Sequence, residues 1–306
     1  MKFTEGYWEK SERANASHAM QAFIVEEIPN GMQIVAPFHI ITDRSGALDV
    51  GTITIEFTAI RKDVISVRSW HFEGYQRKEP RFELNKDMQD VDVEITDEKA
   101  IMTAGRMQVC VDRKDFKIEY KADGKVLTTC GFRNIGYMQY DRSNSTKFPE
   151  SNYMYSDYTP YMNTELSLAP GECVYGMGER FTSFVKNGQV VDCWNEDGGT
   201  ASQISYKNIP FYMTNKNYGI LVDHTDNVSF EVASEKVEYV GFSVKGEELR
   251  FDLIYGDTMK DVIRTYTDLT GKPALAPGWS FGLWLTTSFT TNYDEETTST
   301  FINGME

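Results

Sequence analysis

The loop formed by residues 194–200 contains residue types that could bind a sugar. It reads Trp-Asn-Glu-Asp-Gly-Gly-Thr and so combines one aromatic side chain with two carboxylates and two glycines. Carboxylates accept hydrogen bonds from sugar hydroxyls, and an aromatic face packs against the C–H groups of a sugar ring. The same residues also suit a plain turn, in which Asp197-Gly198 supplies positive φ and binds nothing. The composition leaves both interpretations open, with Trp194 and Asp197 as candidate contacts.

A second segment, residues 175–181, has two closely spaced glycines and superficially matches a phosphate-binding loop. It lacks a third glycine, a following helical pattern and the lysine of a Walker motif. We therefore favour a glycine-hinged strand in which Glu179 and Arg180 make local pairs.

Other kinds of catalytic site find no support in the residue pattern. No serine lies in a G-x-S-x-G motif, and neither the histidines nor the cysteines show metal-ligand spacing. The residues concerned are His18, His39, His71, His224, Cys110, Cys130, Cys173 and Cys193. We expect reduced thiols and neither a metal nor a cofactor. A glycosidase needs two carboxyl groups about 5–5.5 Å or about 6.5–9.5 Å apart, and acidic residues are too numerous here for such a pair to be recognised.

The elements that would position these loops are mostly strands. From about residue 50 to residue 255, apolar and polar residues alternate with a period of two, as in Ile53, Ile55 and Phe57. Turn dipeptides separate the runs, and Asn187-Gly188 is the clearest hairpin signal because apolar pairs flank it. More than ten short strands without intervening helices predict a large antiparallel β-sandwich over residues 1–256.

Residues 146–170 do not fit this periodicity. The segment carries Tyr153, Tyr155, Tyr158 and Tyr161 among Ser, Asn and Pro. We favour a long connection whose tyrosines pack on the sandwich. The alternative is a set of stacking platforms for a sugar or a protein partner.

The pattern changes at Asp257, a good N-cap residue. Residues 257–269 have helical spacing, and Gly271 and Pro273 end it, so residues 257–272 are predicted to be a connecting helix. Residues 279–287 form a nearly continuous apolar run, typical of a strand buried on both faces. Asp294 is predicted to cap a further helix that is still running at Glu306. Residues 273–306 therefore indicate the beginning of a second domain, cut inside a βα unit.

Composition limits the classes of partner. The 306 residues contain 31 Lys and Arg against 46 Asp and Glu, for a formal net charge of −15. Such an acidic surface repels phosphate backbones and anionic lipids, so neither nucleic acid nor membrane is an expected partner. There is no apolar run long enough for a transmembrane helix and no apolar leader, and a cytoplasmic location is expected.

Several segments together resemble glycoside hydrolase family 31. The resemblance is carried by residues 175–181, 194–200, 207–214, 219–222 and 273–284, and residues 285–294 are similar to the bacterial α-xylosidases. It is dense from about Gly171 to Glu306 and thinner over the first 150 residues. The family implies an N-terminal β-sandwich followed by a (β/α)8 barrel, here represented by its first strand and part of its first helix.

The same resemblance implies roles for particular residues. The family's enzymes are retaining exo-glycosidases whose aspartate nucleophile and aspartate acid/base lie on later barrel strands, and so beyond Glu306. Asp197 matches the acid of a sandwich loop that reaches over the barrel mouth to the non-reducing sugar. Phe289 matches an aromatic residue after the first barrel strand that shapes the −1 subsite, at the strand ends where barrel active sites form.

The resemblance therefore implies the N-terminal portion of an α-xylosidase, inactive by itself. An α-glucosidase of the same family and a non-catalytic sugar-binding or oligomerisation sandwich are the alternatives. The expected partners are an α-xyloside or α-glucoside oligosaccharide, the remainder of the catalytic barrel, and a second copy of the chain.

Overall fold

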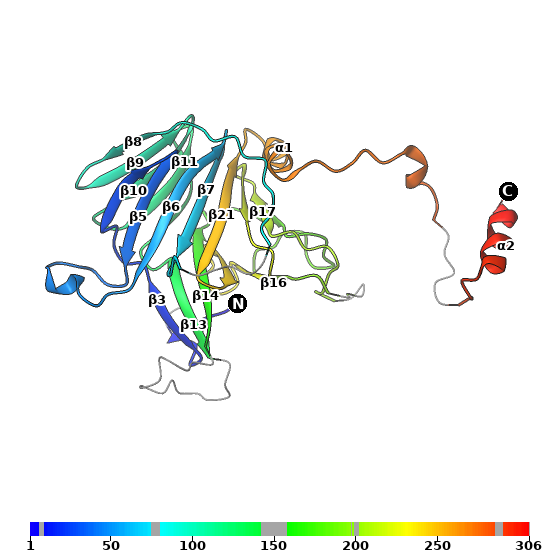
Figure 1. Cartoon of the computed structure of the whole chain (residues 1–306), viewed down its shortest axis with the longest axis horizontal. Helices are drawn as coiled ribbons and strands as arrows, with labels where there is room; N and C mark the ends of the chain where they lie inside the picture. The colour runs from blue at the N-terminus through cyan, green and yellow to red at the C-terminus, as the bar shows by residue number, and fades with distance from the viewer. Residues whose placement is uncertain are drawn as a thin grey trace. The chain divides into compact units, whose positions relative to one another are not determined.

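The computed structural model of this chain describes residues 1–5, 9–74, 80–141, 158–196, 198, 202–284 and 290–305. These residues form two units, Met1–Gly271 and Lys272–Glu306. Strands dominate the first unit (Figure 1). None of the described helices is long and apolar enough to span a membrane.

The largest sheet among the described residues has eight antiparallel strands. Their spatial order is β15 (Val174–Gly176), β17 (Phe211–Thr214), β18 (Tyr218–Val222), β21 (Glu248–Tyr255), β7 (Val64–Trp70), β6 (Thr52–Arg61), β5 (Gly31–Pro37) and β4 (Ile24–Ile28). A short 3₁₀ helix, Ser45–Ala47, interrupts the connection from β5 to β6.

Two smaller sheets and one strand pair complete the first unit. The six-stranded sheet has the order β16 (Gln189–Cys193), β19 (Val228–Val232), β20 (Tyr239–Lys245), β14 (Tyr158–Ser167), β13 (Ile135–Asp141) and β3 (Ala14–His18). The five-stranded sheet has the order β12 (Lys125–Gly131), β11 (Lys117–Ala122), β10 (Met107–Asp112), β9 (Lys99–Ala104) and β8 (Asp92–Ile95). The pair is β1 (Thr4–Glu5) with β2 (Glu9–Lys10).

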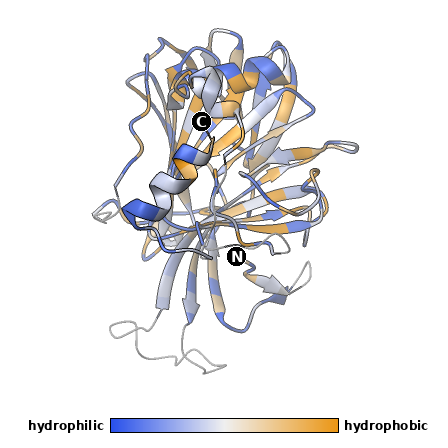
Figure 2. Ribbon diagram, turned by 90° about the vertical axis from the view of Figure 1, so that its right-hand side faces the viewer, coloured by the Kyte–Doolittle hydropathy of each residue, from blue (hydrophilic) through white to orange (hydrophobic). Residues whose placement is uncertain are grey.

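The main core lies where the smaller sheets pack on the eight-stranded sheet. Alternate residues of each strand face inward, as the period-two pattern predicts, and hydrophobic positions alternate with hydrophilic ones along the strands (Figure 2). Tyr120 of β11 contacts Phe57 and Phe251 of the large sheet, with ring centroids 6.3 and 6.4 Å apart. Phe242 of β20 contacts Phe251 from the six-stranded sheet at 5.3 Å. The predicted antiparallel β-sandwich is confirmed.

The turn at Asn187-Gly188 forms, but it does not join two strands. Gly188 has a φ of +84°, as the dipeptide predicts. The preceding residues are not a strand, Phe184 is 78% exposed, and β16 pairs with β19 instead. The reason is that Lys186 donates its backbone N–H to Val174, 2.8 Å away, so the chain before the turn follows β15. The prediction that this turn joins the two strands of a hairpin was therefore wrong.

The tyrosine-rich segment is also more regular than predicted in its second half. Tyr158–Ser167 is β14, in the interior of the six-stranded sheet between β13 and β20. Tyr161 packs against Phe3, with ring centroids 5.6 Å apart. Tyr153 and Tyr155 lie outside the described residues.

Helix α1 (Met259–Thr270) packs on the outer face of the eight-stranded sheet, and a helix here is as predicted. Val262 and Leu269 are fully buried in a second core with residues of β6, β7, β17, β18 and β21. Tyr266 stacks on Phe211 with centroids 4.1 Å apart. Ile263, which the helical spacing places on the same apolar face as Val262 and Tyr266, is 42% exposed.

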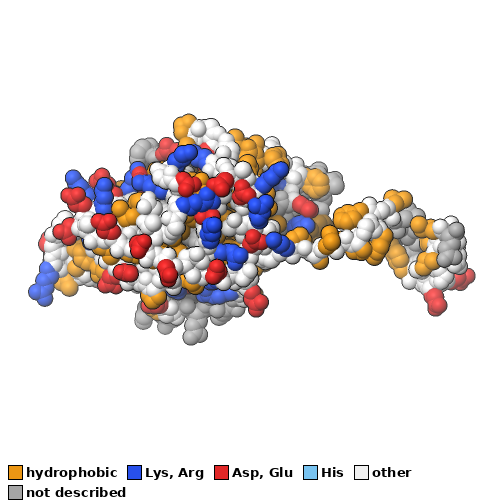
Figure 3. All heavy atoms as spheres, turned by 90° about the horizontal axis from the view of Figure 1, so that it is seen from above, with side chains coloured by type: hydrophobic (Ala, Val, Ile, Leu, Met, Phe, Trp, Pro, Cys, Tyr) orange, Lys and Arg blue, Asp and Glu red, His pale blue; other side chains and the backbone are white. Residues whose placement is uncertain are grey.

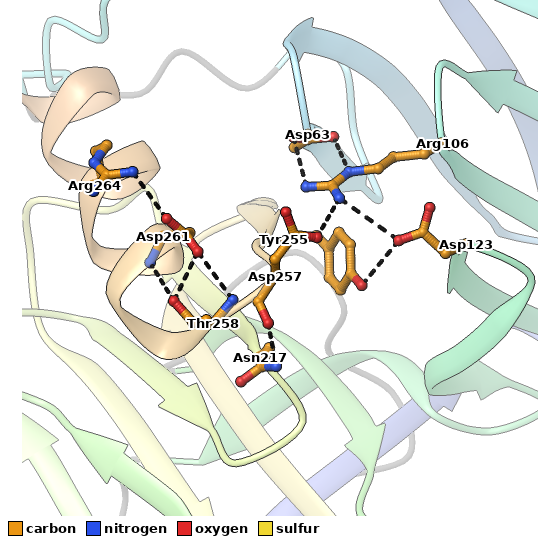
Figure 4. Close-up of polar contacts among 9 residues, drawn as sticks. All are labelled: Asp63, Arg106, Asp123, Asn217, Tyr255, Asp257, Thr258, Asp261 and Arg264. Atoms are coloured by element: carbon orange, nitrogen blue, oxygen red, sulfur yellow. Dashed lines mark hydrogen bonds and ion pairs between the residues drawn. The ribbon is translucent and has the colours of Figure 1, made fainter.

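The start of α1 is fixed by a cap and by a charge cluster (Figure 4). Thr258, not Asp257, is the N-cap, and it forms a capping box with Asp261. Asp257 instead accepts a 2.6 Å hydrogen bond from Arg106. Arg106 also binds Asp63 through two hydrogen bonds of 2.8 and 3.0 Å, and it lies over the Tyr255 ring. The Arg106 side chain thus connects the turn between β9 and β10 with the eight-stranded sheet and with the residues that lead into α1.

The second unit, Lys272–Glu306, contains a 3₁₀ helix, Gly278–Phe281, and helix α2, Glu295–Met305. Asp294 accepts a 2.8 Å hydrogen bond from the Thr297 N–H, so the predicted N-cap is confirmed. The prediction of a strand over residues 279–287 is wrong for residues 279–284, which the structure describes, since Trp279–Phe281 belong to the 3₁₀ helix. A strand needs neighbouring strands to bind its N–H and C=O groups, and no described strand pairs with this segment.

Candidate functional site

The loop that follows β16 is fastened to its surroundings mainly by one arginine. Arg180 donates to the backbone carbonyls of Met177, Asp192 and Gln203, at 3.1, 2.9 and 3.0 Å. It also binds the side-chain carbonyl of Asn208. A guanidinium group suits this role because its donors are held in a rigid, planar fork. Arg180 therefore joins three separate segments of chain at the base of the loop.

Asn208 makes the second set of connections. Its side-chain amide donates to the carbonyls of Trp194 and Ser205, at 2.8 and 2.9 Å, and to the side chain of Asn195 at 2.9 Å. The Glu196 N–H donates to the Ser205 carbonyl at 3.1 Å. The two sides of the loop are thus bonded to each other at their base.

Two glycines permit this close packing. A Cβ atom on Gly178 would overlap the backbone of Lys207, and one on Gly198 would overlap the backbone of Ile204. Gly178 also has a φ of +88°, which favours glycine. The segment 175–181 is therefore a glycine-hinged strand end, as we favoured, and Glu179 makes its local pair with Lys207 at 3.4 Å.

A cleft of about 340 Å³ opens beside the loop, and we call it the Trp194 cleft. Its lining includes Arg180, Gln189, Asp192, Trp194, Glu196 and Gln203. Trp194 is 47% exposed, so much of its indole ring is available to a ligand. An aromatic face beside carboxylate and amide groups can bind a polyhydroxylated molecule.

The predicted contacts are only partly described by the structure. Trp194 lines the cleft, and its contact with a sugar stays a prediction. Asp197 and Phe289 fall outside the described residues, so their predicted roles remain predictions. Arg180 was expected to make only a local pair, and Asn208 was not singled out at all. Arg180 binds three backbone carbonyls and Asn208 binds two, and such carbonyls leave no trace in the amino-acid sequence.

The titratable groups near the cleft do not form a nucleophilic centre. Burial raises the pKa of the Cys193 thiol to about 11, against the opposing effect of Arg180, so the thiol stays protonated at neutral pH. Burial, and secondarily Arg180, lowers the pKa of Lys186. No group of three or more His, Cys, Asp or Glu in the described ranges could hold a metal ion. The described part of the site can bind and orient a ligand.

Comparisons with known proteins add a family relationship. A family model for the "Glycosyl hydrolase 31 N-terminal galactose mutarotase-like domain" matches residues 54–231. The whole chain is 41% identical over 307 residues to the alpha-xylosidase XylQ of Lactiplantibacillus pentosus and covers 38% of that protein. It is 39% identical over 320 residues to an alpha-xylosidase of Emericella nidulans, again over the whole chain, and covers 40% of it.

A solved structure supports the fold. The cycloalternan-forming enzyme from Listeria monocytogenes, solved with a pentasaccharide substrate, superposes with a TM-score of 0.70 at 18% identity. The superposition covers 89% of this chain and 24% of that enzyme. The chain thus spans about two fifths of the length of the two alpha-xylosidases, and it matches their N-terminal part.

Proposed function

Since the chain belongs to glycoside hydrolase family 31, we propose that it is the N-terminal, substrate-lining part of a retaining α-xylosidase. That enzyme would remove terminal α-linked xylose from the non-reducing end of an oligosaccharide. The observation that carries the proposal is the identity of about 40% to two alpha-xylosidases over the whole chain. An α-glucosidase is the second candidate, because an alpha-glucosidase of Bacillus thermoamyloliquefaciens is 25% identical over 76% of the chain.

In this proposal the sandwich contributes substrate contacts, and the catalytic carboxylates belong to the remainder of the barrel. Arg180 and Asn208 hold the base of the loop that carries Asp197, so that Asp197 can bind a hydroxyl of the non-reducing sugar. Phe289 would line the −1 subsite. Residues 273–306 would be completed by the rest of the barrel, where a nucleophile and an acid/base supply the two carboxyl groups of a retaining mechanism.

The proposal predicts that the 306-residue chain alone does not hydrolyse aryl α-xylosides or α-glucosides. The decisive experiment is a chimera in which the chain replaces the matching N-terminal part of XylQ. We expect the chimera to cleave p-nitrophenyl α-xyloside faster than the α-glucoside. Faster cleavage of the glucoside would favour the second candidate. Turnover by the 306-residue chain itself, lost when one of its own acids is replaced, would contradict the proposal.

The role of Asp197 can be tested in the same chimera. Asp197→Ala should lower kcat/KM for the xyloside about 10- to 100-fold, because a hydrogen bond to a charged group contributes roughly 1.5–3 kcal/mol. Asp115→Ala, an exposed acid in the turn between β10 and β11, is the matched control. Equal kcat/KM values for the two variants would show that Asp197 does not contact the substrate.

A further inference from the structure

A second cleft lies on the outer face of the six-stranded sheet, and we call it the outer cleft. It encloses about 580 Å³, within the range of roughly 300–1,000 Å³ that small-molecule sites occupy. Ser229 of β19 and Ser243 of β20 are cross-strand partners and form part of its lining. These small side chains leave the space that larger neighbours surround.

Several polar groups around this space are not engaged by the described residues. One carboxylate oxygen of Asp192 accepts a 2.5 Å hydrogen bond from Ser229, while the other has no hydrogen-bond donor in the described part of the chain. The Lys245 ammonium group is exposed and makes no ion pair with a described residue. The Asn227 side-chain amide is likewise exposed, with no described partner. The outer cleft therefore offers both donors and acceptors to a ligand.

The charges of the outer cleft favour a neutral ligand. Asp192, Asp226 and Glu231 bring three carboxylates, and Lys2, Lys245 and the Met1 N-terminus bring three ammonium groups, of which the N-terminus already lies 3.6 Å from Glu231. An anion would meet the three carboxylates, within a chain whose net charge is already −15. A molecule with many hydroxyl groups can bind both kinds of charged group, because each hydroxyl donates and accepts.

An aromatic ring is fixed in the same cleft. Tyr161 lines it from β14, and its ring packs against Phe3 and Tyr140, with centroids 5.6 and 6.5 Å apart. The first strands of the chain lie near β13 and β14 (Figure 1). Such packing reduces the rotamer freedom that the Tyr161 side chain would lose on binding, so it favours a ring that contacts sugar C–H groups.

The outer cleft adjoins the Trp194 cleft. Val190, Asp192 and Asn227 line both spaces. Asp192 is well suited to connect them, because Arg180 binds its backbone carbonyl while its carboxylate extends to Ser229. A ligand several units long can therefore extend from Trp194 towards Tyr161 along the face of β16 and β19 that carries Asp192 and Ser229.

We propose that the outer cleft binds the remote units of a neutral oligosaccharide carrying α-linked xylose. The identity of the sugar rests on the proposed function, whereas the preference for a neutral, polyhydroxylated ligand comes from the cleft itself. The site would retain the long part of the substrate while its non-reducing end is processed elsewhere.

Isothermal titration of the 306-residue chain with a xyloglucan heptasaccharide tests this proposal. Asp192→Ala and Lys245→Ala should each weaken binding about tenfold or more. The matched controls are Asp115→Ala, in the turn between β10 and β11, and Lys125→Ala at the start of β12, both exposed and outside the cleft. Thermal unfolding of Lys245→Ala and of both controls should match that of the parent chain, whereas Asp192→Ala also loses the hydrogen bond from Ser229, so Lys245→Ala is the variant that separates lost contacts from lost fold.

Other outcomes would overturn the proposal. Binding that is lost in Trp194→Ala but unchanged in Asp192→Ala and Lys245→Ala would restrict the sugar to the Trp194 cleft. Displacement of the heptasaccharide by inorganic phosphate would show an anion site. Failure here is distinguishable from failure of the proposed function, because binding is measured on the chain alone and hydrolysis is measured on the chimera.

Discussion

At the level of single residues, the chain segments at the candidate site are held together above all by Arg180. Its guanidinium group binds three backbone carbonyls and the Asn208 side chain. Arg180→Ala should lower the free energy of unfolding by about 2–4 kcal/mol, since a hydrogen bond from a charged donor contributes roughly 1.5–3 kcal/mol and such bonds are not additive. Urea unfolding measures the loss, with the exposed Arg44→Ala as control. The role assigned to Arg180 fails if the two variants are equally stable.

Asp252 should make stability depend on pH. It is fully buried in β21. Burial, with a smaller effect from Asp223, raises its pKa from 3.8 to about 7, while the Ser66 hydroxyl, Arg250 and Lys86 oppose the rise. Between these values the folded protein holds a proton that the unfolded chain has released, so this group's contribution to stability falls as pH rises from about 4 to about 7.

Asp252→Asn should therefore remove that pH dependence. At pH 8 the variant should be more stable than the parent, by roughly 4 kcal/mol at most, because a pKa difference of one corresponds to about 1.4 kcal/mol. At pH 4 the two proteins should differ little. Urea midpoints measured from pH 4 to pH 8 provide the check, with the exposed Asp115→Asn as control. Parallel pH profiles for the parent and Asp252→Asn would show that Asp252 is not the titrating group.

At the scale of elements, α1 depends more on its cap than on its ion pair. Thr258→Ala removes the side chain that accepts from the Asp261 N–H, and should cost about 0.5–2 kcal/mol. Asp257→Asn weakens the contact with Arg106, but the Asp257 side chain is 71% exposed, so the expected cost is about 0–1 kcal/mol. Thr258→Ser, which keeps the cap, is the control. If Asp257→Asn lowers the free energy of unfolding more than Thr258→Ala does, α1 depends more on the ion pair than on the cap, and the prediction is wrong.

Elements were predictable from sequence where a local pattern decided them. The period-two alternation located β6, β19 and β21, because alternate apolar residues of each strand belong to the main core whichever strand lies beside it. The pattern failed where a distant partner decides. Asn187-Gly188 forms its turn, yet the chain before the turn is hydrogen-bonded to β15. Asp257 does not cap α1, because its carboxylate accepts a hydrogen bond from Arg106.

The same distinction explains what could be predicted of the site. The residue types of 194–200 and the family resemblance identified the loop that carries Trp194. Arg180, which positions this loop, could not be recognised from the sequence. It binds the backbone carbonyls of Met177, Asp192 and Gln203, and every residue type has such a carbonyl. The outer cleft was also missed, because its lining residues come from strands far apart in the sequence.

At the scale of the whole molecule, the second unit differs from the first in what covers its apolar residues. The first unit buries its large side chains between sheets. In the described part of the second unit, six large apolar side chains are two-thirds or more exposed: Leu275, Trp279, Phe281, Leu283, Trp284 and Met305. Hydrophobic side chains are prominent on the surface of this segment (Figure 3). Such a surface marks an interaction site or an association hazard.

We therefore expect the 306-residue chain to self-associate through residues 279–306. Light scattering should give a larger mass for the chain than for a version ending at Lys272, because removing Trp279, Phe281 and Leu283 removes the apolar surface that a second copy would cover. The full-length variant Trp279→Gln with Leu283→Gln, which keeps the chain length, should also have the smaller mass. Val126→Gln, at an exposed apolar position on β12, should associate like the parent chain. If all four proteins are equally monomeric, the segment does not drive association, and its apolar side chains require another partner, for which the remainder of the barrel is the first candidate.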